Sequence, residues 1–332
     1  MRHYLATLQS NMKSLGDKPA LCNYRGETIT NGQLAEHIAQ FAFAFENAGI
    51  KPGDKIAICA KNTARWAVSF LSSNAYRAVT VTILCDFHPD SISGLVNHSE
   101  SIVLFTDKEI WDKLDKSEMP LLKVAVNVDD FSVLYSSDES IGKAFDGRKE
   151  AFEAAYPNGF GKDDFSLPTD NFDELAVINY TSGTTSAPKG VMLTYGNLSS
   201  SIAFGHDHIP VHADDSIVSM LPMAHIYGMV YEFLYPLAGG CTVYFLGKTP
   251  APSLLLKAMH DVQPFLVCTV PLVMGKVYKS SIKPILGKWY MKVLTAIPGV
   301  RRIIFNKVRS GLDTAFGGKG RSYIMGGAAL SR

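Results

Sequence analysis

The sequence has few of the features that mark secreted, membrane-spanning or nucleic-acid-binding proteins. Its cysteines include no CxxC pair, so we expect a reduced, cytoplasmic environment. No apolar run reaches about 18 residues, and the opening residues contain no apolar signal core. These absences predict a soluble protein, or one that lies at most on the inner face of a membrane. A formal net charge of +1 gives no support for nucleic-acid binding. The cysteines are Cys22, Cys59, Cys85, Cys241 and Cys268.

The chain alternates between apolar runs of strand length and stretches with helical character. Its 332 residues, 47% of them hydrophobic, can bury a large core and are too many for one simple domain. Such alternation argues for parallel α/β sheets. Helices are expected at 64–77 and 252–262. The expected strands are 55–60, 78–84, 102–106, 124–128, 175–180, 217–221, 242–246 and 265–270.

A capped helix is predicted between residues 30 and 53. Thr30 and Gln33 have the spacing of a capping box, and Gly49 is placed to end the helix. Its apolar positions recur at helical spacing, which predicts one buried face. These positions are Leu34, Ile38, Phe41 and Phe45.

An acidic segment, 129–174, breaks the rhythm of strands and helices. It contains 12 acidic and 4 basic residues together with several glycines and prolines. We interpret it as a solvated excursion that can include short helices.

A histidine-rich stretch, 205–215 (GHDHIPVHADD), invites a metal hypothesis because it holds His206, His208 and His212 among three aspartates. However, Pro210 interrupts the run and no distant partner is marked. A solvated loop is the favoured interpretation.

The run 180–191, YTSGTTSAPKGV, is the most informative part of the sequence. Small residues let backbone N–H groups turn inward, hydroxyls add donors, and Lys189 adds a positive charge, a combination that suits a polyphosphate. Apolar β-like runs at 175–180 and 191–194 flank it. The run therefore predicts a phosphate-binding loop between two strands; the alternative is a Ser/Thr/Gly-rich surface turn. Its hydroxyl residues are Thr181, Ser182, Thr184, Thr185 and Ser186.

The loop is not the P-loop of nucleoside triphosphatases. Counting from Gly183, Pro188 stands where that motif needs its second glycine, and Gly190 stands at its hydroxyl position. A β-prone run follows instead of a helix, so the loop lacks a helix dipole. Phosphate charge would then be met by Lys189, the hydroxyls and a metal ion.

At this point the chain resembles the adenylate-forming superfamily of acyl-CoA synthetases, amino-acid adenylation domains and luciferases. Residues 182–190 match the family's signature loop except at Ser186, where the family usually has glycine. A serine there would stiffen the loop if that glycine uses a positive φ. Three further stretches are similar to family motifs: 30–53, 221–228 (LPMAHIYG) and 322–331 (SYIMGGAALS).

The resemblance implies a fold of two packed, mostly parallel sheets flanked by helices, and ATP-dependent activation of a fatty acid to acyl-AMP, followed by transfer to coenzyme A with Mg²⁺ assistance. It also implies that residues 1–332 are the N-terminal portion of such an enzyme, with subdomains near 1–175 and 176–332. The later family motifs and the C-terminal lid domain would lie beyond Arg332, so we expect these residues to be inactive alone.

The resemblance also implies roles for individual residues. Lys189 and the backbone around Gly183 would hold the β- and γ-phosphates, and the Thr184 and Thr185 hydroxyls would bind phosphate or help to place Mg²⁺, with Lys189 and Thr184 as catalytic residues. The expected nucleotide-binding residues are Thr181, Ser182, Gly183, Thr184, Thr185, Lys189, Gly326, Gly327 and Ala328.

An acyl pocket is expected around His225, which follows a predicted strand at the edge where open α/β sheets bind ligands. The apolar stretch 226–238 would wall this pocket or form core. Because 226–231 contain no acid, a simple carboxylic acid is favoured over an amino acid. The expected pocket residues are His225, Tyr227, Gly228 and Met229. The alternatives are an aryl- or medium-chain acid–CoA ligase, or a non-catalytic nucleotide- or acyl-binding module.

A basic segment, 276–321, contains eleven basic residues and one acid, Asp313. Its apolar residues at 300, 304, 308 and 312 predict an amphipathic helix. Such a surface suits an anionic membrane or the phosphates of coenzyme A. An ordinary solvated helical face is the equally weighted alternative.

Overall fold

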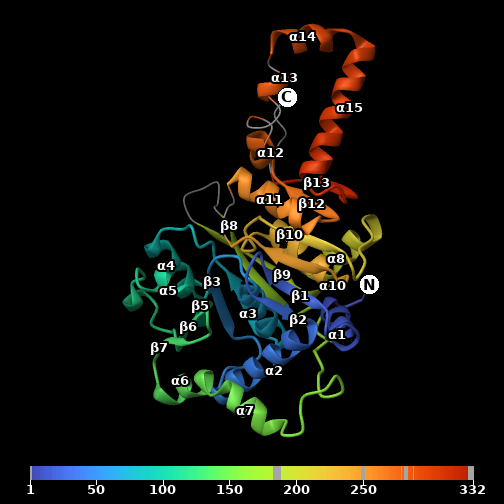
Figure 1. Cartoon of the computed structure of the whole chain (residues 1–332). Helices are drawn as coiled ribbons and strands as arrows, with labels where there is room; N and C mark the ends of the chain where they lie inside the picture. The colour runs from blue at the N-terminus through green and yellow to red at the C-terminus, as the bar shows by residue number, and fades with distance from the viewer. Residues whose placement is uncertain are drawn as a thin grey trace.

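The computed structural model describes residues 2–181, 188–247, 251–277, 279, 283–286 and 288–327 (Figure 1). No described helix is both long and apolar enough to cross a bilayer. The strands are β1 (Pro19–Asn23), β2 (Thr28–Thr30), β3 (Lys55–Cys59), β4 (Val79–Thr82), β5 (Ser101–Thr106), β6 (Val124–Asn127), β7 (Val133–Ser136), β8 (Leu175–Thr181), β9 (Lys189–Thr194), β10 (Ser216–Ser219), β11 (Thr242–Phe245), β12 (Leu266–Thr269) and β13 (Ser322–Met325).

Helices connect most of these strands. They are α1 (Tyr4–Ser14), α2 (Asn31–Asn47), α3 (Ala64–Ala75), α4 (Pro89–His98), α5 (Lys108–Trp111), the 3₁₀ turn η1 (Lys116–Glu118), α6 (Glu139–Asp146), α7 (Arg148–Ala155), α8 (Tyr195–His208), α9 (Ile226–Gly228), the π-helical turn η2 (Met229–Leu234), α10 (Tyr235–Ala238), α11 (Pro252–Val262), α12 (Pro271–Val277), α13 (Lys283–Leu286), α14 (Trp289–Ala296) and α15 (Pro298–Ala315).

The strands form two sheets, each mostly parallel. One has the order β13-β12-β10-β11-β1-β2, and only its β1–β2 pair is antiparallel. The other has the order β7-β6-β5-β3-β4-β8-β9, with antiparallel pairs only at its two edges. The expected architecture is therefore confirmed. The boundary expected near residue 175 does not separate the sheets, because β8 and β9 complete the second sheet and β1 and β2 complete the first.

All eight strands predicted from apolar runs are present, and each observed end lies within two residues of the predicted one. The edge strand β7 was not predicted, because it lies in the acidic segment 129–174 and its side chains are partly exposed. The short helices anticipated in that segment are α6 and α7. The stretch with His206 and His208 is the last turn of α8, so the solvated-loop expectation is wrong for these two residues.

Helix α3 lies between the sheets, where it contacts β1 of one and β3 and β4 of the other. Most of its residues are buried, including Trp66 and Phe70, whose rings stack 5.6 Å apart. Helix α2 packs against α3 and buries the face predicted from its apolar spacing. These buried rings belong to one hydrophobic core that also includes residues of both sheets.

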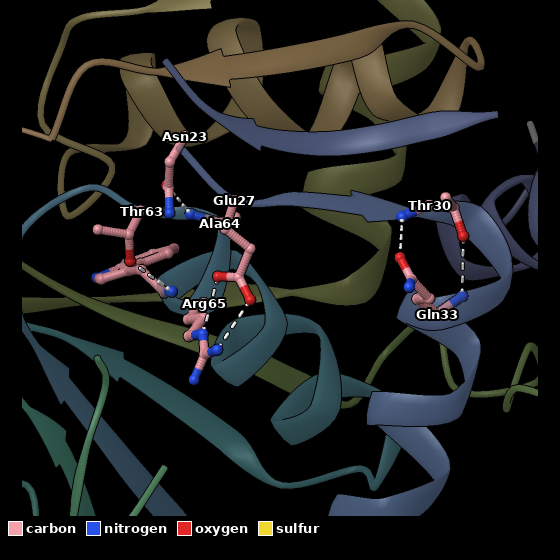
Figure 2. A network of polar contacts seen from close by, with 8 residues as sticks. Asn23, Glu27, Thr30, Gln33, Thr63, Ala64 and Arg65 are labelled. Atoms are coloured by element: carbon pink, nitrogen blue, oxygen red, sulfur yellow. Dashed lines mark hydrogen bonds and ion pairs between the residues drawn. The ribbon is translucent and has the colours of Figure 1, made fainter. Parts of the chain in front are cut away.

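Polar contacts fix the beginnings of α2 and α3 against the β1–β2 hairpin (Figure 2). The predicted capping box is confirmed: the Thr30 hydroxyl accepts from the Gln33 backbone N–H, and the side-chain oxygen Oε1 of Gln33 accepts from the Thr30 backbone N–H. At α3, the Arg65 guanidinium donates to both carboxylate oxygens of Glu27 at 2.8 and 2.9 Å (Figure 2). These contacts place the loop before α3 beside the first sheet.

Helices α13, α14 and α15 form an arm that projects away from both sheets (Figure 1). The predicted amphipathic helix is α15, and its residues at 300, 304, 308 and 312 are half-buried while most of their neighbours are exposed. The base of α15 contacts α11. The arm therefore has apolar residues that the two sheets do not cover.

We predict that Thr30→Ala lowers the free energy of unfolding by about 1 kcal/mol, because it removes the side-chain acceptor at the first turn of α2. Urea denaturation measures the change. Thr314→Ala is the matched control: its hydroxyl donates to the Ser310 carbonyl on exposed α15 and caps no helix start. Equal losses in the two variants would contradict the role of the capping box.

Candidate functional site

The predicted phosphate loop connects an antiparallel pair of strands. Strand β8 ends at Thr181 and β9 begins at Lys189, and these two residues are direct partners in the ladder. Ser182, Gly183, Thr184, Thr185 and Ser186 lie outside the described residues, so their predicted roles stay predictions. The hairpin placement itself agrees with the two flanking strands expected from the sequence.

Close packing at the base of this hairpin requires glycine. A Cβ added at Gly190 would come within 2.9 Å of Ile178 and 3.4 Å of the Tyr180 ring. Lys189, the preceding residue, is exposed. The ammonium group of Lys189 is thus carried on a strand end whose backbone position is fixed by the β8–β9 pairing.

A cavity of about 360 Å³ lies where strands of both sheets reach their carboxyl ends. Residues that end or follow β8, β10, β12 and β13 contribute to its wall, as expected for ligand binding in open α/β sheets. None of the described side chains that line it is an acid, a lysine or an arginine, and the one titratable group near neutral pH is the imidazole of His225. The described lining residues are Asn179, Thr181, Leu221, Pro222, His225, Ile226, Tyr227, Gly228, Val270 and Gly327.

Five residues predicted from the sequence meet at this cavity: Thr181, His225, Tyr227, Gly228 and Gly327. They come from distant parts of the chain, and only the fold brings the phosphate-loop strand to the acyl-pocket motif. Ala328, the last of the predicted glycine-alanine wall, lies outside the described residues. The structure therefore assembles one site from what the sequence showed as three separate motifs.

His225 stands at the start of α9 and is half-buried. Its carbonyl accepts from the Met229 N–H, and its own N–H donates to the Pro222 carbonyl at 3.0 Å. Burial lowers the pKa of its imidazole below the usual 6.5. A neutral ring therefore faces the cavity at physiological pH, which suits contact with an uncharged ligand group.

The ring of Tyr227 lies against the glycine wall. A Cβ at Gly326 would sit 3.2 Å from this ring, and Gly327 has a φ of +79°, which disfavours any other residue. Gly228 is equally constrained, because a Cβ there would lie 2.7 Å from the Pro222 carbonyl oxygen. Glycine at these positions lets Tyr227 and the loop before α9 approach the end of β13.

Met229 differs from the other predicted pocket residues. It is fully buried at the start of the π-helical turn η2 and does not line the cavity. Its side chain belongs to the core beneath the site. The cause is the turn of the helix, which directs Met229 inward while Tyr227 faces the cavity.

Three residues that hold the loop 220–225 were not identified from the sequence. Asn62 donates to the Leu221 carbonyl at 2.6 Å and accepts from the Met223 N–H at 3.1 Å. Asn179 donates to the Ala224 carbonyl and, at 2.7 Å, to the Thr82 hydroxyl. Both are single polar residues near strand ends, and nothing in their spacing marks them.

The third residue is Glu232, in η2. Its Oε2 accepts from the backbone N–H groups of Met220 and Leu221 at 2.8 and 2.7 Å, and its side chain is fully buried. The sequence held a signal for it, because it is the single acid in the otherwise apolar stretch 226–238. An acid in such a stretch has either to be exposed or to find buried donors.

The histidine-rich stretch forms no metal site in the part of the chain that the structure describes. The imidazole of His206 contacts the Tyr235 carbonyl, and that of His208 contacts the Phe204 carbonyl. The backbone N–H of His212 donates to the carboxylate of Asp215. The metal hypothesis is therefore not supported.

We predict that the buried Glu232 makes the protein less stable as pH rises from about 5 to about 8. Burial raises the pKa of this carboxyl from 4.5 to about 8, against the opposing effect of the Leu221 and Met220 N–H groups. Within that interval the unfolded chain loses a proton that the folded chain keeps, so the stability falls by at most about 1.4 kcal/mol per pH unit.

Urea denaturation of the native protein and of Glu232→Gln at pH 5, 6.5 and 8 isolates this effect. The difference in unfolding free energy between the two proteins should shift with pH in favour of the variant. A difference that stays constant across these pH values would show that Glu232 is ionised in the folded state.

The AMP-binding enzyme family matches residues 8–332 of this chain. Long chain acyl-CoA synthetase 5 of Arabidopsis thaliana is 23% identical, over 97% of this chain and 51% of that protein. Long-chain-fatty-acid–CoA ligase 5 of Rattus norvegicus is 27% identical, over 91% of this chain and 47% of that protein. The chain thus spans about half the length of the curated relatives it matches.

Solved structures show the same fold. The N-terminal domain of FACL13 from Mycobacterium tuberculosis superposes with a TM-score of 0.71 at 17% identity, covering 100% of this chain and 71% of that one. ATP-bound MatB from Rhodopseudomonas palustris gives a TM-score of 0.65 at 21% identity, covering 85% of this chain and 52% of that one.

The resemblance inferred from the signature loop is therefore confirmed by a family match over nearly the whole chain and by the shared two-sheet fold. This chain belongs to the AMP-binding enzyme family.

Proposed function

We propose that the protein activates a fatty acid with ATP, forming an acyl-adenylate, and passes the acyl group to coenzyme A. The observation that carries this proposal is the cavity at the carboxyl ends of both sheets, where the phosphate-loop strand and the acyl-pocket motif meet. Family membership supports an acid–thiol ligase reaction. The names of the relatives from Arabidopsis thaliana and Rattus norvegicus support a long-chain fatty acid.

A carboxylate is a poor acyl donor because its leaving group would be oxide. The proposed reaction first gives the acyl group a better leaving group, AMP. Attack of the carboxylate oxygen on the α-phosphorus of ATP forms a C–O–P linkage and releases pyrophosphate; the thiol of coenzyme A then attacks the acyl carbon and AMP leaves. The first step depends mainly on stabilising the charge of the departing pyrophosphate. Lys189 at the start of β9, with the predicted loop hydroxyls, would supply that stabilisation.

Mg²⁺ would neutralise phosphate charge during this step. The described residues contain no group of three acidic, histidine or cysteine side chains that could hold a metal ion. The predicted ligand Thr184 lies outside the described residues. The described side chains therefore do not form a dedicated Mg²⁺ site.

The lining of the cavity supports an uncharged acyl group. Leu221, Ile226 and Val270 supply apolar surface, and no lysine, arginine or acidic side chain is among the described lining residues. An amino-acid substrate would leave its ammonium group without a partner there. A panel of long-chain, medium-chain and aryl acids, assayed with ATP and coenzyme A, distinguishes the fatty acid from the alternatives.

We predict that Lys189→Met lowers acid-dependent pyrophosphate release at least tenfold in the protein expressed from its complete reading frame, because it removes the positive charge beside the predicted phosphate loop. Lys257→Met is the matched control, since Lys257 is an exposed lysine on α11. Pyrophosphate release is measured by a coupled assay at saturating fatty acid. Undiminished release in Lys189→Met would refute the proposed role of the loop.

We also propose that the arm α13–α15 contacts an anionic membrane surface. Trp289, Ile303 and Val293 have exposed fractions of 77%, 60% and 58%, which is unusual for large apolar side chains. Exposed basic residues of the arm, including Arg301 and Arg302, lie among them. Apolar side chains that can enter the lipid interface, beside cations that attract anionic headgroups, favour a lipid surface as the partner.

Flotation with liposomes tests this contact. We predict that the protein binds phosphatidylcholine vesicles that contain about 30% phosphatidylglycerol, because the anionic headgroups attract the basic arm. The double change Arg301→Glu and Arg302→Glu should abolish this binding. Lys108→Glu together with Lys113→Glu, in and just after α5, keeps the charge change but leaves the arm intact. Equal binding to pure phosphatidylcholine, or no binding at all, would reject the proposal.

A further inference from the structure

The loop that carries His225 leaves the first sheet at the end of β10, where strand pairing stops. Met220 and Leu221 are both buried, with exposed fractions of 7% and 6%. Their N–H groups donate to Oε2 of Glu232 and not to a neighbouring strand. Removal of that acceptor would leave two buried donors without a partner, which costs more than an ordinary exposed hydrogen bond.

Glu232 reaches these donors from a π-helical turn. The turn η2 follows directly on α9, whose residues Tyr227 and Gly228 line the cavity. π-helical turns are rare and occur frequently at functional sites. Glu232 therefore connects the backbone that enters the loop with the helix that leaves it.

The opposite side of the same loop is held by residues of the second sheet and its connections. Asn62, between β3 and α3, binds both the Leu221 carbonyl and the Met223 N–H. Asn179 on β8 donates to the Ala224 carbonyl. Glu232 in η2 and these two amides of the second sheet and its β3–α3 connection therefore hold the backbone from residue 220 to residue 224.

We propose that Glu232 is a positioning residue for the acyl-adenylate site: by holding the Met220 and Leu221 N–H groups it sets the path of the loop that presents Leu221, Pro222 and His225 to the cavity. Glu232 does not touch the cavity itself, so its effect is transmitted through the loop. This inference rests on the proposed function, because it concerns the same site.

The protonation of Glu232 supports this arrangement. Burial raises the pKa of its carboxyl to about 8, so a neutral group accepts the two N–H bonds at physiological pH. Glutamine has nearly the same shape and keeps a carbonyl oxygen as acceptor. Leucine has a similar volume but offers no acceptor. The two substitutions therefore separate the hydrogen bonds from the packing.

The test is the affinity for a non-hydrolysable acyl-adenylate analogue, palmitoyl-sulfamoyl adenosine, measured by isothermal titration calorimetry on the protein expressed from its complete reading frame. We expect Glu232→Gln to bind within about threefold of the native protein and Glu232→Leu to bind at least tenfold more weakly. Urea denaturation reports the stability of each variant.

Phe145→Leu is the control for general destabilisation, because Phe145 is a fully buried residue of α6 and does not line the cavity. Helix α6 packs against the edge strand β7 and lies far from α12 and β13 (Figure 1). The Phe145→Leu change should lower stability without changing analogue affinity. If Glu232→Leu does not fold, Glu232→Asp takes its place: it keeps the carboxyl but withdraws it by one methylene, and should also weaken binding at least tenfold.

Native-like affinity in Glu232→Leu, or in Glu232→Asp where that variant replaces it, overturns the positioning role and leaves the proposed function intact. The positioning role is also overturned if Phe145→Leu weakens binding to the same extent. Failure of the native protein to bind the analogue overturns the proposed function, and the positioning role with it. Weak binding by Glu232→Leu with rescue by Glu232→Gln supports the inference.

Discussion

The site depends on how the backbone of one short loop satisfies its hydrogen bonds. Where β10 ends, the chain turns through residues 220–225, most of them buried, and strand pairing no longer supplies partners. Buried N–H and C=O groups need partners wherever the backbone is not regular. Glu232, Asn62 and Asn179 supply them from three other elements. The result is a loop with a defined path at the junction of the two sheets.

The junction itself follows from packing. Helix α3 buries most of its residues between the sheets, and the connection before it contributes Asn62 to the loop on one side. On the other side, Asn23 of β1 accepts from the Ala64 N–H at the start of α3 (Figure 2). The connection between β3 and α3 therefore makes hydrogen bonds to two parts of the first sheet, the loop after β10 and strand β1. Through Asn62 it contacts the loop that leads to the acyl-pocket motif, although the two are far apart in sequence.

The glycines of the site have a common physical cause. At Gly190, Gly228 and Gly326, a Cβ would meet a carbonyl oxygen or another side chain at 2.7 to 3.2 Å. Gly228 and Gly326 lie where the backbone approaches a second backbone segment or the ring of Tyr227 beside the cavity, and Gly190 lies against side chains of the paired strand β8. The arm α13–α15 shows the opposite condition, since several of its large apolar side chains are exposed. Close approach characterises the site, and exposure characterises the arm.

The sequence alone determined many of the elements and the chemistry of the motifs. Apolar spacing was sufficient for the eight predicted strands and for α2 and α11, because periodicity reflects burial of one face or of a whole strand. The signature 182–190 indicated phosphate chemistry, since residue type alone supplies donors and charge. Apolar periodicity and residue type are both local properties, so they can be recognised in the sequence without knowledge of the fold.

Only the tertiary structure decided which residues meet. It placed Met229 in the core and Tyr227 at the cavity, although both lie in the same apolar stretch, because helix rotation and not composition sets the facing side. It showed that His206 and His208 end a helix and bind carbonyl groups. It also assigned Glu232 and Asn62 to one loop, since a hydrogen bond across 12 or 161 residues of sequence exists only when the chain has folded.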